Sequence, residues 1–393
     1  MLLLIVSNNM SKPILIYLHW PFCLSLCPYC DFNSHLAAKI DQDKWLQAYL
    51  KEINFFIDKI KNKKVKSIFF GGGTPSLMNP KIVAAIIDYI AKIATIDDNT
   101  EITLEANPTS SEVDKFIEFR NAGINRVSIG IQALNDRDLQ KLGRKHNSKE
   151  AINAINLASN IFPRFSFDLI YARPQQTMQE WQQELTLAIN DLPLKGHISL
   201  YQLTIEKGTE FYKLYNNKQL TLPENDLAAN MYEWTNNYLI ANGYERYEIS
   251  NYAIKGEECK HNLGYWHYEE YIGIGPGAHS RLHLKNKILA NMMIHKPDKW
   301  LDQVLTKGDG IQQQVKLSTK EIIEEIIMMG MRLSSGISDH NLQQLLNLKF
   351  SDVLKQDTLQ EYINLGLIKD NKDKLCLTDK GLLLHSYIVP RLC

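Results

Sequence analysis

Short apolar runs alternate along the chain with longer stretches in which apolar residues recur every three or four positions. Each short run is bounded by turn residues and is typical of a strand. Six strands are predicted, over residues 14–20, 65–70, 101–107, 126–132, 165–171 and 197–203. The amphipathic stretches between them predict helices, over residues 43–60, 79–94, 111–122, 135–142, 148–159 and 177–190. Asn79 is placed to cap the second helix, with Pro80 at its first position.

This alternation of strand and helix predicts parallel strands joined by crossover helices, hence an α/β barrel or a doubly wound sheet. Polar residues and glycines follow each strand, and these favour a barrel, because barrel sites are built at the carboxyl ends of the strands. They are Cys23, "GGGTP" at 71–75, Glu105 with Asn107, Gln132, Asp168, and Gln202 with Thr204. We therefore expect a partial (β/α)6 barrel.

The pattern changes after residue 205. A long helix is predicted over 223–242, followed by a glycine- and aromatic-rich stretch over 260–280. From about residue 317 the pattern predicts helices and a small hairpin, similar to a winged helix. The expected organisation is an N-terminal extension, a barrel, a linking region and a mainly helical C-terminal domain, over residues 1–13, 14–245, 246–310 and 311–393.

Charge gives no sign of a nucleic-acid partner. The chain carries 44 lysines and arginines against 44 aspartates and glutamates, and residues 315–393 carry ten of each sign. A winged-helix-like domain without a basic face is expected to pack rather than to bind DNA. The apolar start "MLLLIV" is too short for a membrane span or a signal peptide, so we expect a cytoplasmic protein that begins at Met1 or Met10.

Three cysteines, Cys23, Cys27 and Cys30, lie within eight positions in "CLSLCPYC", and the other three are isolated. A structural zinc site needs four ligands, and no second cysteine pair is present. A 4Fe–4S cluster has four irons, so three thiolates would leave one iron open for a substrate or cofactor. Ordinary buried thiols, or zinc completed by a remote histidine, are the alternatives that the residues leave open.

The spacing Cys-x3-Cys-x2-Cys resembles the signature of radical S-adenosylmethionine (SAM) enzymes. In these, the SAM amine and carboxylate bind the open iron, and an electron from the cluster cleaves SAM to a 5′-deoxyadenosyl radical. Further segments resemble the oxygen-independent coproporphyrinogen III oxidase-like family, in particular its haem-chaperone branch. They are "IYLHWPFCLSLCPYCDFNSH", "FFGGGTPS", "EANP", "RVSIGIQALND", "GR" at 143–144, "FDLIYARPQQT" and "HNLGYW".

The resemblance implies a role for single residues. Cys23, Cys27 and Cys30 match the cluster ligands. Positions matching SAM contacts are Tyr17, Phe32 at the adenine, Gly72, Gly73 and Thr74 at the methionyl group, Glu105, Gln132, Arg144, Asp168 and Thr204. Carboxylates suit an ammonium or ribose hydroxyls, and arginine suits a carboxylate. For Phe32, a buried aromatic that packs the loop is the alternative, and Arg144 could be an ordinary cation at a helix end.

Two departures from the oxidase argue against its decarboxylation reaction. The oxidase has a fourth cysteine two positions after the third, where this chain has Phe32. Its N-terminal extension is also longer than the 22 residues that precede Cys23 here. Both departures match the haem-chaperone branch.

The motif "HNLGYW" resembles one linked to haem binding in that branch. His261 would be the axial ligand, because neutral imidazole binds iron, and Tyr265 and Trp266 would offer flat apolar surface to the porphyrin. His19 and His279 are competing ligands, and a hydrogen-bonded core histidine is the alternative for His261.

The leading hypothesis is thus a haem-binding radical SAM protein that carries a 4Fe–4S cluster and SAM. It would be a cytoplasmic protein that delivers haem to respiratory haem proteins at the inner membrane. A homodimer is an open alternative to a monomer. The rival hypothesis is the oxidative decarboxylation of coproporphyrinogen III, with a deoxyadenosyl radical that abstracts a propionate hydrogen. A radical SAM enzyme with an unrelated substrate is the third.

Overall fold

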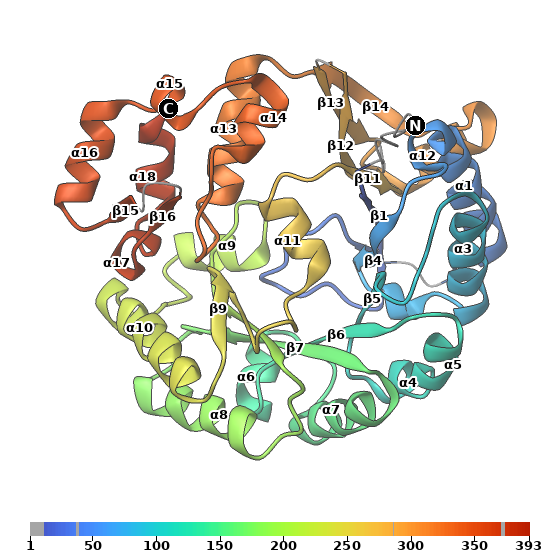
Figure 1. Ribbon diagram of the computed structural model, residues 1–393. Helices are drawn as coiled ribbons and strands as arrows, with labels where there is room; N and C mark the ends of the chain where they lie inside the picture. Colours follow the sequence, from blue (N-terminus) through green and yellow to red (C-terminus); the bar gives the residue numbers. More distant parts are fainter. Residues whose placement is uncertain (1–11, 37–38, 286, 371–373) are drawn as a thin grey trace, which may run out of the picture.

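The structure is a computed structural model that describes residues 12–36, 39–285, 287–370 and 374–393. The predicted N-terminal extension, residues 1–13, therefore lies outside the described residues except for its last two. Figure 1 shows an open, curved sheet with helices on its outer side and a helical domain beside its open edge.

Six parallel strands form the middle of a twelve-stranded sheet. Each matches a predicted strand to within two residues at either end. The strands are β1 (Ile14–Trp20), β4 (Val65–Gly72), β5 (Glu101–Ala106), β6 (Arg126–Gln132), β7 (Arg164–Tyr171) and β8 (His197–Gln202). Because they pair in parallel in chain order, their carboxyl ends meet at one end of the barrel. The predicted fold class, a partial (β/α)6 barrel, is confirmed.

Helices cover the outer face of this sheet, where they alternate with the strands (Figure 1). They are α1 (Gln42–Phe55), α2 (Ile57–Ile60), α3 (Pro80–Ile93), α4 (Ser110–Val113), α5 (Phe116–Asn121), α7 (Ser148–Ile161), α8 (Met178–Asn190) and α10 (Asn225–Ala241). The Asn79 side chain caps α3 by accepting from the N–H of Lys81, as predicted. The predicted helix over 43–60 is interrupted at Phe56, whose N–H is shared between the carbonyls of Glu52 and Ile53.

Shorter elements complete the connections. A small pair, β2 (Phe22–Cys23) and β3 (His35–Leu36), brackets the cysteine loop. The others are the 3₁₀ turn η1 (Pro75–Leu77) and the helices α6 (Asp136–Lys141), α9 (Glu210–Asn216) and α12 (Pro297–Lys307).

Side chains alternate between the two faces of each strand. On β4, Ile68 and Phe70 are fully buried in the main hydrophobic core, which the outer helices cover. The opposite face, inside the barrel, is mostly polar and includes Tyr17, His19, Ser67, Thr103, Glu105, Arg126, Ser128, Ser166 and Asp168. Helix α11 (Lys260–Trp266) lies against this inner face and contacts β4. The core thus holds the sheet rigid from outside, and the interior is free for polar chemistry.

The predicted linking region, residues 246–310, supplies strands to both edges of the sheet. At one edge, β11 (Tyr271–Ile274) pairs in parallel with β1, and β12 (His279–Leu284) and β13 (Lys287–Met293) follow in antiparallel order; β14 (Ile311–Lys316), which lies just beyond the predicted linking region, continues this order. At the other edge, β10 (Asn251–Ala253) and β9 (Glu245–Glu248) extend the sheet beyond β8. The domain boundaries drawn from the sequence stay a prediction.

The C-terminal domain is mainly helical and has a hydrophobic core of its own. It contains α13 (Thr319–Gly330), α14 (His340–Leu346), α15 (Phe350–Val353), α16 (Gln356–Asn364), the hairpin β15 (Ile368–Asp370) and β16 (Leu375–Leu377), α17 (Asp379–Leu382) and α18 (His385–Leu392). Two ion pairs join it to the β9 edge of the barrel: Arg332 to Glu248 at 3.0 Å and Arg246 to Asp379 at 2.5 Å.

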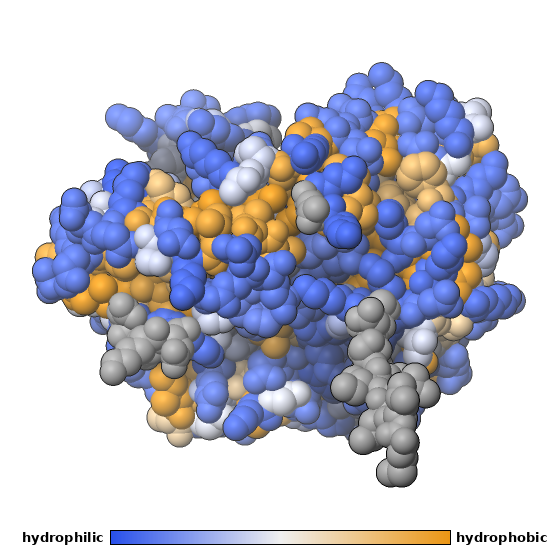
Figure 2. All heavy atoms as spheres, turned by 45° about the horizontal axis from the view of Figure 1, so that its top comes forward, coloured by the Kyte–Doolittle hydropathy of each residue, from blue (hydrophilic) through white to orange (hydrophobic). Residues whose placement is uncertain are grey.

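Hydrophilic side chains dominate much of the surface, and on the face shown in Figure 2 they surround a band of apolar residues. Within the described ranges, no helix is both long enough and apolar enough to cross a membrane.

Candidate functional site

A cavity of about 420 Å³ opens at the carboxyl ends of the parallel strands. Fourteen residues were expected to bind the cluster or SAM or to be the axial haem ligand. The wall of the cavity brings together twelve of them, although they come from seven separate segments. They are Cys23, Cys27, Cys30, Phe32, Gly72, Gly73, Thr74, Glu105, Gln132, Arg144, Asp168 and Thr204. Tyr17 and His261 do not line it. The alignment of parallel strand ends produces this convergence.

The cysteine loop leaves β1 and folds over the cavity. Its turn is closed by a hydrogen bond from the N–H of Cys30 to the carbonyl of Cys27, at 3.1 Å. The Thr74 hydroxyl donates to the Cys23 Sγ at 3.3 Å, and the Arg144 guanidinium donates to the Cys27 Sγ at 3.4 Å. Burial raises the pKa of the Cys23 and Cys30 thiols. Thiolates at these positions therefore need a cationic partner, which a cluster of irons supplies.

The three thiols have the donor chemistry that a 4Fe–4S cluster requires. All three are free, half-buried and on the wall of one cavity. Among the described residues, no three cysteine, histidine or carboxylate side chains converge as the ligands of one ion would. In a 4Fe–4S cluster each thiolate binds a different iron, so separated thiols around a common space are what such a group requires.

Gly72 is the last residue of β4 and Gly73 follows it, beneath the cysteine loop. Gly72 has φ +113°, and a Cβ there would lie 2.6 Å from the His19 ring. A Cβ at Gly73 would lie 2.7 Å from the carbonyl oxygen of Phe22. Only glycine fits this close approach.

Two carboxyl groups, Glu105 and Asp168, belong to the inner wall. Burial and the nearby charge of Asp168 raise the pKa of Glu105 to about 8, and burial raises the pKa of Asp168 to about 6. The Gly72 N–H donates to Glu105 Oε2 at 3.1 Å, and the Ser128 hydroxyl donates to Asp168 Oδ1 at 3.4 Å. Two negative charges cannot both be held here at low cost, so a bound cation or hydroxyl donor would favour their ionised forms.

The guanidinium of Arg144 connects the strand ends to the cysteine loop by hydrogen bonds. Besides Cys27, it donates to Asn107 Oδ1 at 2.6 Å and to the carbonyl of Gly130 at 2.7 Å. Arg144 is therefore not an ordinary cation at a helix end, because its hydrogen-bond partners belong to the strand ends and to the cysteine loop.

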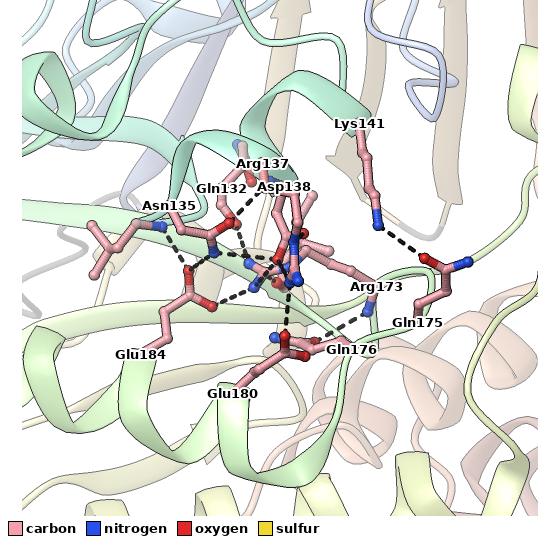
Figure 3. A network of polar contacts seen from close by, with 12 residues as sticks. Gln132, Asn135, Arg137, Asp138, Lys141, Arg173, Gln175, Gln176, Glu180 and Glu184 are labelled. Atoms are coloured by element: carbon pink, nitrogen blue, oxygen red, sulfur yellow. Dashed lines mark hydrogen bonds and ion pairs between the residues drawn. The ribbon is translucent and has the colours of Figure 1, made fainter.

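Gln132 ends β6 in a left-handed conformation, with φ +73°. The buried guanidinium of Arg173 holds this turn by donating to the carbonyls of Gln132 at 3.3 Å and Ile170 at 3.1 Å. The same group pairs with Asp138 at 2.9 Å and Glu184 at 2.5 Å (Figure 3). Arg173 is a functional residue that the sequence pattern did not indicate; its one local signal is an arginine just after a predicted strand, in "YARPQQ".

Apolar side chains surround the mouth of the cavity on the cysteine-loop side. Phe32 is 63% exposed, and Leu24, Leu26 and Leu36 are exposed as well. The alternative of a buried aromatic that packs the loop is therefore wrong for Phe32.

The "HNLGYW" motif forms α11, inside the barrel. His261 is fully buried; its Nδ1 is 2.7 Å from the Ser67 hydroxyl, and its ring stacks on Phe69 with centroids 4.9 Å apart. Burial lowers its pKa to about 3, so the ring is neutral. It lines neither this cavity nor a second one, described below. Its role as haem ligand stays a prediction.

The remaining predicted residues surround this motif or the sheet edge. His19 uses both ring nitrogens, 3.0 Å from the Tyr17 hydroxyl and 2.9 Å from the carbonyl of Asn33. Tyr17 is thus between His19 and His261, with ring centroids 6.3 Å from the latter. His279 is exposed at the start of β12.

Known protein families and structures match the fold described above. Residues 17–188 match the model of the radical SAM superfamily, and residues 317–384 match that of the HemN C-terminal domain. The solved coproporphyrinogen III oxidase (HemN) of Escherichia coli superposes with a TM-score of 0.81, covering 98% of this chain and 91% of its own. At 20% identity this likeness shows the fold alone.

Three relatives are more similar in sequence. The chain is 36% identical to heme chaperone HemW of Buchnera aphidicola, over 94% of this chain and 95% of the relative. It is 37% identical to heme chaperone HemW of Haemophilus influenzae, with the same coverage. It is 35% identical to the mitochondrial radical S-adenosyl methionine domain-containing protein 1 of Danio rerio, over 95% of this chain and 86% of the relative. The chain belongs to the HemW-like family of radical SAM proteins, a family whose members are built around a 4Fe–4S cluster and SAM.

Proposed function

We propose that this protein is a haem chaperone, which binds haem and delivers it to respiratory haem proteins while holding a 4Fe–4S cluster and SAM at the barrel mouth. The observation that carries the proposal is its identity of 36% and 37% to two proteins named heme chaperones, each aligned over 95% of its length. Phe32, at the position where the oxidase has its fourth cysteine, supports the same assignment.

The residues of the cavity divide into two groups by chemistry. Cys23, Cys27 and Cys30 would bind three irons of the cluster, and the charge of Arg144 beside Cys27 would stabilise the thiolate form. When bound, the cluster and SAM supply one-electron chemistry. The exposed ring of Phe32 would cover the adenine.

The second group would hold SAM itself. The backbone at Gly72, Gly73 and Thr74 would receive its ammonium group, because glycine carries no side chain of its own that could cover the backbone carbonyls. Glu105 and Asp168 would pair with the ammonium or the ribose hydroxyls. Gln132 and Thr204 would add neutral polar contacts, and Tyr17 would support this floor from inside the barrel.

The proposal includes a place and partners. The protein would act in the cytoplasm, at the inner membrane only through a membrane-associated haem acceptor, with no nucleic acid as partner. The balanced charge of the chain fits this. A homodimer is compatible with it.

An anaerobic assay separates the chaperone from the rival oxidase. Protein with a reconstituted cluster is incubated with coproporphyrinogen III, SAM and a reductant, and is titrated with haem in parallel. We expect a shifted haem absorption band and no protoporphyrinogen; clear turnover, or no binding of haem, would overturn the proposal. The Cys27→Ser protein, which should fail to hold iron, is the cluster-free control, and Cys393→Ser, a half-buried thiol outside the site, should keep its iron.

A further inference from the structure

We propose that haem binds in a second cavity, between the barrel and the C-terminal domain, with His283 as its axial ligand. This cavity has a volume of about 370 Å³, within the range of about 300–1,000 Å³ that is usual for small-molecule sites. The inference rests on the proposed function, since it places the haem that a chaperone must carry.

The second cavity is at the end of the barrel opposite to the cysteines. Pro13, directly before β1, and Glu270, directly before β11, are on its wall. The cysteine loop leaves the other end of β1. Haem bound here would be separated from the 4Fe–4S cluster by α11 and the polar interior of the barrel. Haem and the cluster would therefore not compete for one space.

His283, on β12, has the property that an iron ligand needs. Its Nε2 is buried and has no hydrogen-bond partner among the described residues. Burial, with the nearby charges of Lys12 and Lys63, lowers its pKa to about 4 and keeps the ring neutral. A buried nitrogen without a partner costs free energy, and coordination to iron would satisfy it.

Two other histidines, His267 and His340, also line the cavity, but both are exposed and neither is among the buried groups that lack a partner. Of these three, only His283 has a buried ring nitrogen without a partner among the described residues; the Nε2 of His261 is also buried without such a partner, but His261 lines neither cavity.

Apolar and aromatic groups from both domains form part of the walls, beside polar side chains such as Ser338, Asn341 and Gln344. Trp266 and Tyr268 come from the barrel side, and Ile326, Ile337 and Leu345 come from the C-terminal domain. The Tyr268 ring is 5.7 Å from the His283 ring, centroid to centroid. A flat apolar molecule between these faces would be desolvated on both sides.

The charges around the cavity suit an anionic edge such as the haem propionates. Lys12 and Lys374 line it, and within the described part of the chain neither forms an ion pair with a carboxylate. Its two glutamates are each ion-paired with a lysine, Glu270 with Lys63 at 2.5 Å and Glu269, through Oε1, with Lys66 at 2.5 Å. The net charge at the cavity therefore favours an acid.

This site also gives the "HNLGYW" motif a connection to haem without His261 as ligand. Trp266, the last residue of the motif, lines the cavity, and its Nε1 is buried without a hydrogen-bond partner in the described part of the chain. His261 is fully buried five residues earlier, inside the barrel. Changes in the motif would then act on haem through the wall that Trp266 provides.

Haem titration of the wild-type protein and four variants tests the site. We expect His283→Ala to bind haem about tenfold more weakly or worse, to change the absorption band of the bound haem, and to recover that band when free imidazole is added. Leu345→Trp, which fills the cavity, should weaken binding without changing the band of the haem that still binds. His385→Ala is the matched control: His385 is also half-buried and neutral, and its Nε2 has no partner within the described ranges, but it is outside the cavity.

The outcomes separate the site from the function. If wild-type protein binds haem and His283→Ala binds it with the same affinity and band, the site is wrong and the proposed function stands. Loss of binding in His261→Ala with normal binding in His283→Ala would return the ligand to the motif. If wild-type protein binds no haem, the proposed function itself fails. Circular dichroism and the cluster absorbance confirm that each variant is folded.

Discussion

The ionisation of one residue, Glu105, makes the stability of the folded protein depend on pH. Its pKa is raised to about 8 from an ordinary value of 4.5, by burial first and by the charge of Asp168 second. Between these two values the folded protein binds more protons than the unfolded chain. Stability therefore falls as pH rises through this window, by at most about 1.4 kcal/mol per pH unit for one proton. Below pH 4.5 the group is protonated in both states and this loss is absent.

We therefore predict that Glu105→Gln makes the cofactor-free protein more stable relative to wild type at pH 8 than at pH 5. The same change should weaken SAM binding about 10- to 100-fold, because a hydrogen-bonded charge is lost. Denaturant unfolding at both pH values and equilibrium dialysis with SAM measure the two effects. Glu206→Gln, an exposed carboxylate at the same cavity, is the control and should change neither. Equal stability differences at both pH values would contradict the prediction.

At the scale of elements, the ends of β6 and β7 and the helices α6 and α8 meet at Arg173. Its guanidinium is 2% exposed and contacts a group from each of the four (Figure 3). The left-handed turn at Gln132 is maintained by this arrangement rather than by its own preference, since a side chain at positive φ is unfavourable.

Arg173→Met should lower the free energy of unfolding by about 3–5 kcal/mol, because Asp138 and Glu184 would be left buried without this cation. It should also weaken SAM binding, since the Gln132 turn would be released. Chemical denaturation and SAM dialysis measure these effects. Arg137→Met is the matched control: Arg137 pairs with the same Asp138, but its side chain is 56% exposed, and the loss should stay below about 1 kcal/mol. Similar losses in both variants would refute the special role of Arg173.

At the scale of the whole molecule, the C-terminal domain is held against the β9 edge of the barrel. Arg332 pairs with Glu248, which is 1% exposed, and its guanidinium also lies 4.5 Å from the centre of the Trp266 ring. The same interface contains the hydrogen bond from the N–H of Ser334 to the carbonyl of Tyr247. The second cavity depends on this contact, because its walls belong to both sides.

Arg332→Ala should loosen the C-terminal domain, with a loss of about 1–3 kcal/mol from an unpaired buried carboxylate. Amide hydrogen exchange followed by mass spectrometry should show faster exchange in residues 317–393 than in the six parallel strands. Lys320→Ala, in an exposed pair 3.7 Å long, serves as the control and should leave exchange unchanged. Uniformly faster exchange across barrel and domain would instead mean that the two unfold as one unit.

The sequence by itself determined the parallel strands, most of the outer helices and the strand-end residues of the first cavity. Strand and helix follow from the spacing of apolar residues along the chain, which is local information. Parallel alternation then requires the strand ends to meet, so Cys23, Glu105 and Asp168 could be placed at one mouth without coordinates. Three cysteines in one loop needed no tertiary structure to be recognised.

Only the tertiary structure decided which polar side chains are buried and what they contact. Whether His261 is at a surface or inside the barrel depends on α11 packing against β4, nearly 200 positions away in the chain, and Arg173 is defined by partners on other elements. The strands at both sheet edges and the cavity at His283 likewise arise from pairing between distant segments. The spacing of apolar residues along the chain does not predict such contacts, because they form only when the chain has folded.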